Sequence, residues 1–339
     1  MEMKINEREK RESNMLAITV DPKVKESIQL EEVPVPEINP DEVLIKVEAA
    51  ALNHRDIYVN NEWRFLKDQE KLIAGGDGAG VIAQVGNNVT GWSVGDEVML
   101  NPYDMVSEKF LGGPTNGTLA EYVKHSANAI LKKPSYLSFE EAAATPLALS
   151  TAWGTVVTQG KIQKGETVLI QGIGGGVALF ILQLALLKDA KVIVTSGSDE
   201  KIKKAIKMGA VAGFNYKNEN ISQKVMEYTE GKGADVVIDS SGKDSLPSSL
   251  QSLAPDGRLL VFGSTTGGID WEELRTKDFF VETGMVPQAD LEDAARFYAE
   301  HKLRPILSEK VYSLEEYKDA YKELEEQRQF GKIVIKVSK

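Results

Sequence analysis

One stretch of the chain decides its fold: Thr167-Val168-Leu169-Ile170-Gln171-Gly172-Ile173-Gly174-Gly175-Gly176-Val177-Ala178-Leu179-Phe180. The β-branched apolar run predicts a strand, the glycines predict a tight turn, and the apolar continuation predicts a helix. Glycine lets the backbone approach a phosphate closely, and the first turn of the helix offers free N–H groups to the anion. Because a second apolar run at 191–195 completes a βαβ unit, the pattern predicts a site for the pyrophosphate of a dinucleotide.

The spacing of the glycines refines this prediction. A plain G-x-G-x-x-G motif counted from Gly172 would place its third glycine at Val177, whereas the form Gly172-x-x-Gly175-x-x-Ala178 fits the sequence. In this form the loop resembles that of the zinc-free quinone oxidoreductase branch of the medium-chain dehydrogenase/reductase superfamily. The expected cofactor contacts in the loop are Gly172, Gly174, Gly175, Gly176 and Val177.

Composition narrows the class of protein and its partners. The chain has 339 residues, of which 42% are hydrophobic and 27% charged, and this length allows two domains. A net charge of -11 disfavours nucleic acid and anionic membranes as partners, and no apolar run approaches the roughly 20 residues of a membrane span. The charged first 14 residues do not resemble a secretory signal, so we expect a cytoplasmic protein with a small-molecule substrate.

The pattern along the chain predicts an α/β protein. After a charged leader at residues 1–14, strand-like runs occupy 16–20, 28–33 and 43–51. Helices are expected from Ser138 and over 147–157, and strands then alternate with helices until about residue 262. The last expected elements are helices at 290–301 and 314–326 and a strand at 332–337.

The resemblance covers the chain from about Met15 to its end. It is carried by the glycine loop and by the motifs Asn53-His54-Arg55-Asp56, Gly95-Asp96-Glu97-Val98, Gly117-Thr118-Leu119-Ala120-Glu121-Tyr122 and Phe330-Gly331-Lys332-Ile333-Val334. It implies a GroES-like catalytic β domain at residues 15–143 and 285–339. It also implies a Rossmann domain, a doubly wound parallel sheet, at 144–284, an active site in the cleft between the domains, and a homodimer formed through a Rossmann edge strand after Phe262.

The residues argue against a catalytic metal. The chain has no cysteine and three histidines, and the positions that resemble zinc ligands of the superfamily's alcohol dehydrogenases are Asn53 and Gly76. His54 alone is more typical of a packing or hydrogen-bonding residue. We therefore expect no metal, and without a Lewis acid the chemistry suits conjugated carbonyls and quinones.

The N-x-x-D-x-Y pattern of the zinc-free branch matches Asn53-His54-Arg55-Asp56-Ile57-Tyr58. The resemblance implies that Asn53 and Tyr58 are the catalytic donors on the substrate side. The alternative is that Asn53 and Asp56 cap a turn and that Tyr58 is a half-buried core residue.

The choice of cofactor is decided at the end of the second strand, Val194-Thr195-Ser196-Gly197, where no carboxylate stands to bind the 2′-hydroxyl of NAD. Lys201 and Tyr216, with Ser196 nearby, resemble the residues that hold the 2′-phosphate of NADPH. The alternative is a solvated lysine and a surface tyrosine, and Asp199 is explained as a first-turn acid of a helix.

Other positions are expected to contact the cofactor. Thr151 resembles a threonine that meets the nicotinamide, although its hydroxyl could instead bond to its own helix. The motifs Ser240-Ser241-Gly242 and Phe262-Gly263-Ser264 end later strands at the edge where such sheets bind ligands, so Ser241, Phe262 and Gly263 are candidates. Lys332 resembles a residue near the cleft, but a lysine that opens an edge strand needs no such role.

These observations predict a zinc-independent, NADPH-dependent reductase that transfers hydride to a quinone or an α,β-unsaturated carbonyl. A zinc-free alcohol or carbonyl dehydrogenase is the alternative enzyme. A redox-sensing NADPH-binding protein with little turnover is the alternative from another class.

Overall fold

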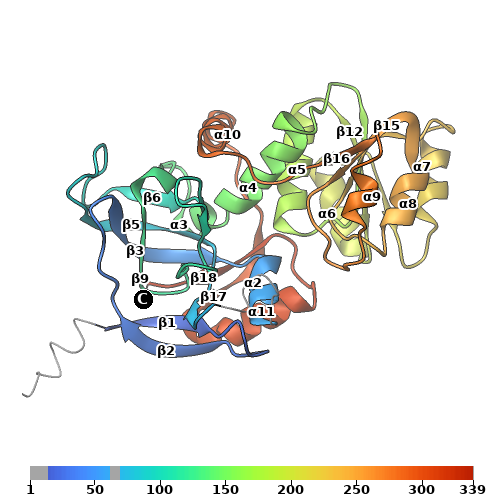
Figure 1. Cartoon of the computed structure of the whole chain (residues 1–339). Helices are drawn as coiled ribbons and strands as arrows, with labels where there is room; N and C mark the ends of the chain where they lie inside the picture. The colour runs from blue at the N-terminus through green and yellow to red at the C-terminus, as the bar shows by residue number, and fades with distance from the viewer. Residues whose placement is uncertain (1–13, 62–68, 339) are drawn as a thin grey trace, which may run out of the picture. The chain divides into compact units, whose positions relative to one another are not determined.

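The structure is a computed structural model that describes residues 14–61 and 69–338 (Figure 1). The chain divides into two compact units, one formed by residues 1–147 and 297–339 and the other by residues 148–296. Of the expected leader at 1–14, only Asn14 lies within the described residues, where it begins the first strand.

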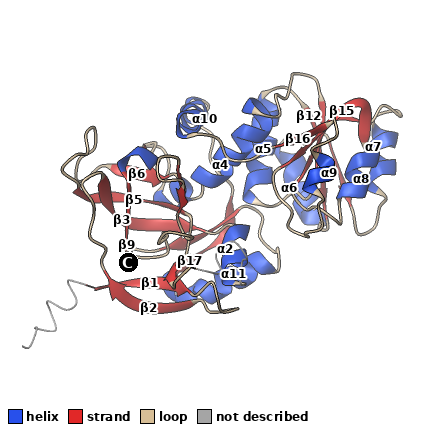
Figure 2. Cartoon of the chain, in the orientation of Figure 1, coloured by secondary structure: helices blue, strands red, loops and turns tan. Residues whose placement is uncertain are grey.

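Sheets dominate the first unit (Figure 2). Its seven-stranded sheet has the order β10-β6-β5-β3-β18-β17, with β9 also paired to β3, beside a three-stranded sheet β2-β1-β4 and a hairpin β7-β8. The strands are β1 (Asn14–Val20), β2 (Gln29–Pro34), β3 (Glu42–Ala51), β4 (Leu72–Ile73), β5 (Asp77–Val85), β6 (Glu97–Leu100), β7 (Tyr103–Asp104), β8 (Lys109–Phe110), β9 (Tyr122–Ser126), β10 (Ile130–Lys132), β17 (Leu307–Ser313) and β18 (Lys332–Lys336).

Among the described residues, three α-helices lie wholly in the first unit: α2 (His54–Asn60), α3 (Phe139–Ala143) and α11 (Tyr317–Glu325). The predicted cap of α3 is present, because the Glu141 N–H donates to Ser138 Oγ and the Ser138 N–H donates to the Glu141 carboxylate. Helix α11 contacts both α2 and β18. Its buried face joins the unit's main core, so the start of α2 is held close to the last strand of the chain.

The second unit contains a six-stranded parallel sheet with the order β13-β12-β11-β14-β15-β16. Numbered from the first strand of the unit, this is the order 3-2-1-4-5-6 that is usual for dinucleotide-binding sheets. The strands are β11 (Thr167–Ile170), β12 (Lys191–Ser196), β13 (Ala212–Asn215), β14 (Ala234–Asp239), β15 (Leu253–Val261) and β16 (Phe280–Glu282).

Five α-helices connect the strands of this sheet: α5 (Gly176–Leu187), α6 (Asp199–Met208), α7 (Ile221–Tyr228), α8 (Leu246–Gln251) and α9 (Trp271–Leu274). A further helix, α10 (Gln288–Glu300), follows the last strand and ends in the first unit. The alternation of strand and helix predicted from the sequence is therefore present. The reason lies in burial: β11 and β12 are almost wholly buried, as their unbroken apolar runs require when helices cover a parallel sheet.

The structure departs from the sequence-based prediction at a few elements. The expected helix at 147–157 is α4 (Pro146–Trp153) followed by a π-helical turn at Gly154–Thr158. There a Cβ on Gly154 would lie 2.2 Å from the Gly284 carbonyl oxygen, so glycine permits a close backbone approach. Strand β13, which is short and contains a glycine, was not predicted, and neither were the two-turn helices α2 and α7.

Candidate active site and nucleotide-binding loop

The glycine loop joins β11 to α5 and has the geometry of an anion site. Gly172 and Gly174 have φ angles of 78° and 135°, which side-chain-bearing residues rarely adopt. Gly175 precedes the first turn of α5, and a Cβ placed on it would meet no atom within 4 Å. The first turn of α5, which includes Val177, thus has no capping side chain, and the space beside its N-cap Gly175 is open, which fits a pyrophosphate.

The loop is anchored to the neighbouring strand. The Ile173 N–H donates to the Thr195 carbonyl oxygen at 2.7 Å, and the Gly172 N–H donates to Thr195 Oγ1 at 3.0 Å. Thr195 Oγ1 in turn donates to Gln171 Oε1 at 2.8 Å. The end of β12 thus fixes the loop before any cofactor binds.

Two residues predicted to hold a 2′-phosphate lie against glycines of this region. A Cβ on Gly174 would lie 3.0 Å from Lys201 Cδ and 3.4 Å from its Nζ, so the Lys201 side chain extends toward the glycine loop. The Tyr216 hydroxyl would lie 2.8 Å from a Cβ on Gly197. Ser196, at the end of β12, is buried, and its Oγ accepts the Ser198 N–H.

The acid nearest this strand end is engaged elsewhere. Asp199 stands in the first turn of α6, and its Oδ1 accepts a hydrogen bond from Asn215 Nδ2 at 2.6 Å. This contact agrees with its interpretation as a first-turn helix acid and explains how its carboxylate is satisfied.

The carboxyl edge of the sheet gathers further candidates. Ser241 Oγ would lie 3.5 Å from a Cβ on Gly172, and a Cβ on Gly263 would lie 3.5 Å from the Ser240 carbonyl oxygen. Ser264, the third residue of the Phe262-Gly263-Ser264 motif, has a buried Oγ without a hydrogen-bond partner among the described residues. Its place directly after Gly263 is the signal that would have added it to the candidates.

Thr151, the remaining candidate of the second unit, lies in α4 and is 6% exposed. Its carbonyl oxygen accepts a hydrogen bond from Thr155 Oγ1 at 2.9 Å, which helps to fix this turn. Its contact with the nicotinamide stays a prediction.

In the first unit, Asn53 lies in a buried polar cluster with Asp77 and Lys332. Lys332 Nζ donates to Asn53 Oδ1 at 2.6 Å and to Asp77 Oδ2 at 2.9 Å, and Asn53 Nδ2 donates to Asp77 Oδ2 at 3.0 Å. The side chains of Lys332 and Asp77 are 4% and 0% exposed. Asn53 and Lys332 were predicted from the sequence, whereas Asp77 was not, although its place beside Gly76 was the available signal.

Asp56 caps the N-terminus of α2 and lies outside the Asn53–Asp77–Lys332 cluster. Its Oδ2 accepts the Asn53 N–H at 2.7 Å, so this carboxyl satisfies the N-terminus of α2. Burial raises the pKa of Asp56 to about 6, against the lowering effects of the Asn53 N–H, Lys332 and Arg55. Asn53 is the N-cap of α2 and forms a capping box with Asp56, as the alternative interpretation expects, and its side chain also bonds to Asp77 and Lys332.

Tyr58 stands in α2 and is half-buried, and burial raises the pKa of its hydroxyl. Burial, and next the charge of Lys332, lowers the pKa of His54. At neutral pH the phenol is protonated and the lowered pKa of His54 favours an uncharged imidazole.

An aromatic ring lies beside Gly76. A Cβ on Gly76 would meet Phe110 Cε1 at 3.3 Å, and the Arg55 guanidinium lies 3.8 Å from the centroid of that ring. Arg55 also donates to the Gly113 carbonyl oxygen. Among residues 14–61 and 69–338, no three His, Cys, Asp or Glu side chains form a group that could hold a metal ion.

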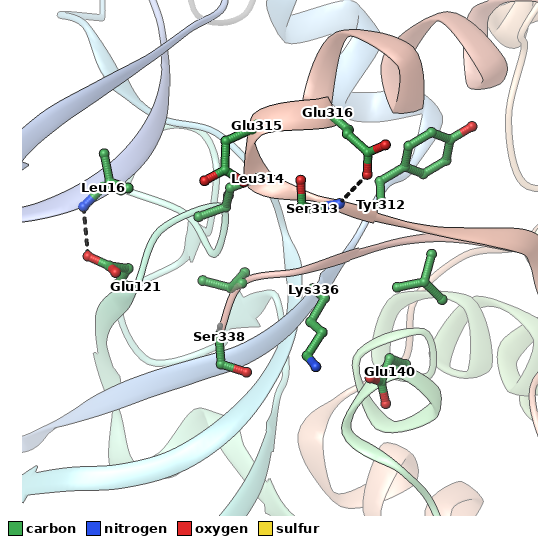
Figure 3. Close-up of a pocket in the computed structure, with 12 residues that line it drawn as sticks. Leu16, Glu121, Glu140, Tyr312, Ser313, Leu314, Glu315, Glu316, Lys336 and Ser338 are labelled. Atoms are coloured by element: carbon green, nitrogen blue, oxygen red, sulfur yellow. Dashed lines mark hydrogen bonds between the residues drawn. The ribbon is translucent and has the colours of Figure 1, made fainter.

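A separate pocket of about 420 Å³ lies in the first unit and is lined partly by β17 and β18 (Figure 3). Two of its carboxylates accept backbone N–H groups: Glu121 from Leu16 and Glu316 from Ser313. None of the predicted site residues lines this pocket, and we assign it no part in the chemistry.

Comparison with known proteins identifies the family. Residues 39–135 match the alcohol dehydrogenase GroES-like domain, and residues 176–298 match the zinc-binding dehydrogenase family. The chain belongs to the medium-chain dehydrogenase/reductase superfamily. The predicted superfamily and the predicted pairing of a GroES-like β domain with a Rossmann sheet are therefore confirmed.

Relatives within the superfamily carry several activities in their names. A zinc-type alcohol dehydrogenase-like protein of Schizosaccharomyces pombe is 34% identical over 92% of this chain and 96% of its own length. Acryloyl-coenzyme A reductase of Sulfurisphaera tokodaii is 30% identical over 95% of this chain and 100% of its own length. Human quinone oxidoreductase is 31% identical over 68% of this chain and 67% of its own.

Among solved structures, that of an NAD-dependent alcohol dehydrogenase covers 96% of this chain and all of its own, with a TM-score of 0.87 and 33% identity. The chain is thus an oxidoreductase with the fold of nicotinamide-dependent dehydrogenases. No helix within the described residues is both long enough and apolar enough to cross a bilayer.

Proposed function

We propose that this protein is a zinc-independent, NADPH-dependent reductase that transfers hydride to an α,β-unsaturated carbonyl or a quinone. The observation that carries the proposal is the Asn53–Asp77–Lys332 cluster, which presents an amide donor at Asn53, one of the two positions that resemble zinc ligands of the superfamily's alcohol dehydrogenases. Such donors stabilise charge that is already delocalised but do not replace a Lewis acid on a simple alcohol.

The second unit would hold the cofactor. The N–H groups at the start of α5 bind the pyrophosphate, while Lys201, Tyr216 and Ser196 surround the 2′-phosphate. The reduced nicotinamide, when bound, supplies the hydride. Two observations support a preference for NADPH over NADH. Lys201 lies close to Gly174, so an ammonium group stands beside the glycine loop. In addition, β12 does not end in a carboxylate that would repel a 2′-phosphate.

Asn53 and Tyr58 would act on the substrate. An amide N–H of Asn53 supports the carbonyl oxygen on which negative charge collects, and Tyr58 or solvent returns the proton. The phenol of Tyr58 is protonated at neutral pH, as a proton donor must be, and burial raises its pKa further.

The second candidate function is interconversion of a carbonyl and an alcohol. It is favoured by the likeness to the NAD-dependent alcohol dehydrogenase structure and to the zinc-type relative. The acryloyl-coenzyme A reductase and quinone oxidoreductase relatives favour the first candidate.

The deciding experiment compares 2-cyclohexenone and a benzoquinone with cyclohexanone and cyclohexanol, each with NADPH or NADH (or NADP⁺ or NAD⁺ for the alcohol). We expect NADPH oxidation with the enone or the quinone, and saturation of the carbon–carbon double bond in the enone product. Faster interconversion of ketone and alcohol would overturn the proposal in favour of the second candidate. NADPH binding without turnover of any acceptor would indicate the redox sensor.

Cytoplasmic location and assembly as a homodimer remain predictions from the sequence and from the resemblance. Light scattering coupled to size exclusion would test the dimer, for which a mass near twice the 37.2 kDa of the chain is expected.

A further inference from the structure

The cluster around Asn53 fixes which way its amide points. Oδ1 faces the Lys332 ammonium at 2.6 Å, and Nδ2 faces the Asp77 carboxylate at 3.0 Å. Rotation of the amide by 180° would set an NH2 group against the ammonium and a carbonyl oxygen against the carboxylate. Both contacts would be repulsive, so the two charges together hold a single orientation.

One amide hydrogen of Asn53 remains only loosely held. Nδ2 carries two hydrogens, and its contact besides Asp77 is the Ala51 carbonyl oxygen at 3.5 Å, the outer limit of a hydrogen bond. A substrate oxygen can accept a hydrogen bond from this N–H, because only the weak contact with the Ala51 carbonyl oxygen is lost. The Lys332 ammonium, by donating to Oδ1, draws electron density from the amide and strengthens its N–H as a donor.

The cluster draws its members from distant parts of the first unit. Asn53 directly precedes α2, Asp77 begins β5, and Lys332 begins β18. The second oxygen of Asp77, Oδ1, accepts the Leu147 N–H at 2.9 Å, which satisfies a free donor at the start of α4. Both carboxylate oxygens of Asp77 therefore accept hydrogen bonds. The side chain of Asn53 is held directly by β5 and β18, and through Asp77 by α4.

Stability alone does not account for a buried ion pair here. Burying both charges costs solvation that their attraction only roughly restores, and uncharged pairs of similar size are often as stable. We propose, building on the function proposed above, that Asp77 and Lys332 are positioning residues that orient and polarise the Asn53 amide for the substrate's carbonyl oxygen. Lys332 then serves the reaction through Asn53 in the first unit.

A double-mutant comparison tests this inference. The paired variant D77N/K332M removes both charges together and keeps an amide oxygen for the Leu147 N–H, so it leaves no buried charge unpaired. The control K133M/E97Q removes another ion pair of the same unit whose lysine is 5% exposed and that makes no contact with Asn53. Both pairs of substitutions are also introduced into N53A, and melting temperatures verify folding.

We expect D77N/K332M to lower kcat about tenfold, because a misoriented donor loses most of its effect. The KM for NADPH should change less than about twofold. In the N53A background the same pair of substitutions should change kcat less than about twofold, since there is no amide left to orient. An equal tenfold loss in both backgrounds would overturn the inference.

A second measurement needs no substrate. In protein with ¹⁵N-labelled asparagine, the side-chain NH2 signals of Asn53 are assigned by their loss in N53A. We expect D77N/K332M to shift these signals and speed their exchange with water, and K133M/E97Q to leave them in place. Unchanged signals in D77N/K332M would contradict the inference, whereas absence of enone or quinone turnover by the wild type would contradict only the proposed function.

Discussion

Replacing Asp56 by asparagine should make the protein more stable at neutral pH and not at acid pH. Asp56 is 3% exposed, and burial raises its pKa from an ordinary 3.8 to about 6. The folded state therefore holds this proton more tightly than the unfolded state. The resulting stability is complete below about pH 4 and is lost as the pH rises through 6.

The magnitude follows from the size of the shift. About two pKa units correspond to roughly 3 kcal/mol between the protonated and the ionised carboxyl, most of which is lost between pH 4 and 7.5. An asparagine cannot ionise, yet its Oδ1 can still accept the Asn53 N–H that Asp56 now accepts at 2.7 Å. The free energy of unfolding of D56N relative to wild type should therefore rise by about 2 kcal/mol over this interval.

The assay is urea unfolding of both proteins at pH 4.5, 6 and 7.5, with the exposed Asp41→Asn as a control in the same unit. Because the other titrating groups are shared, their pH dependence cancels in the difference between variant and wild type. A difference that stays constant from pH 4.5 to 7.5 would refute the assigned shift, and one that falls with rising pH would reverse its sign.

Three further predictions concern the cofactor, the proton donor and the metal. K201E should weaken NADPH binding about ten- to a hundredfold, because it removes a charge-assisted contact of roughly 1.5 to 3 kcal/mol, and should leave NADH binding unchanged. Fluorescence titrations measure both affinities, with a substitution of the exposed Lys203, K203E, as the control. Equal binding of both cofactors before and after K201E would exclude Lys201 from the site. Y58F should lower kcat about tenfold, less than the loss of an essential donor because an enone or quinone spreads the charge; unchanged stopped-flow rates would leave proton return to solvent. Incubation with a chelator should leave turnover intact and elemental analysis should find well under one zinc per chain, and stoichiometric zinc would contradict metal independence.

Much of the fold could be predicted because its signals are local. The apolar run at 167–170 and the glycines after it specify a strand and a turn through neighbouring residues, and Ser138 with Glu141 specifies the start of α3. Prediction from local signals also explains which elements were missed, because short elements give only weak local signals. A four-residue strand with a glycine, such as β13, and a two-turn helix, such as α2, carry too few residues for a periodic pattern.

The candidate site could be predicted only in part. The N-x-x-D-x-Y pattern marks Asn53 and Tyr58, but the residue that donates to Asn53 Oδ1 is Lys332, 279 positions away. No local pattern specifies such a pairing. It follows from the register of β18 and β5 on either side of β3, which forms only when the whole sheet assembles.

The composition of this cluster bears on the direction of the chemistry. A zinc ion coordinates an alkoxide oxygen directly as a Lewis acid, which is how a metal helps to oxidise a simple alcohol. The ammonium of Lys332 is matched by the carboxylate of Asp77, so the ion pair brings no net charge to Asn53. A neutral cluster can orient and polarise an amide donor, but it offers little stabilisation to a localised alkoxide. It suits an acceptor that spreads the arriving charge over a conjugated system, and this is the physical reason to expect reduction of an enone or quinone rather than oxidation of an alcohol.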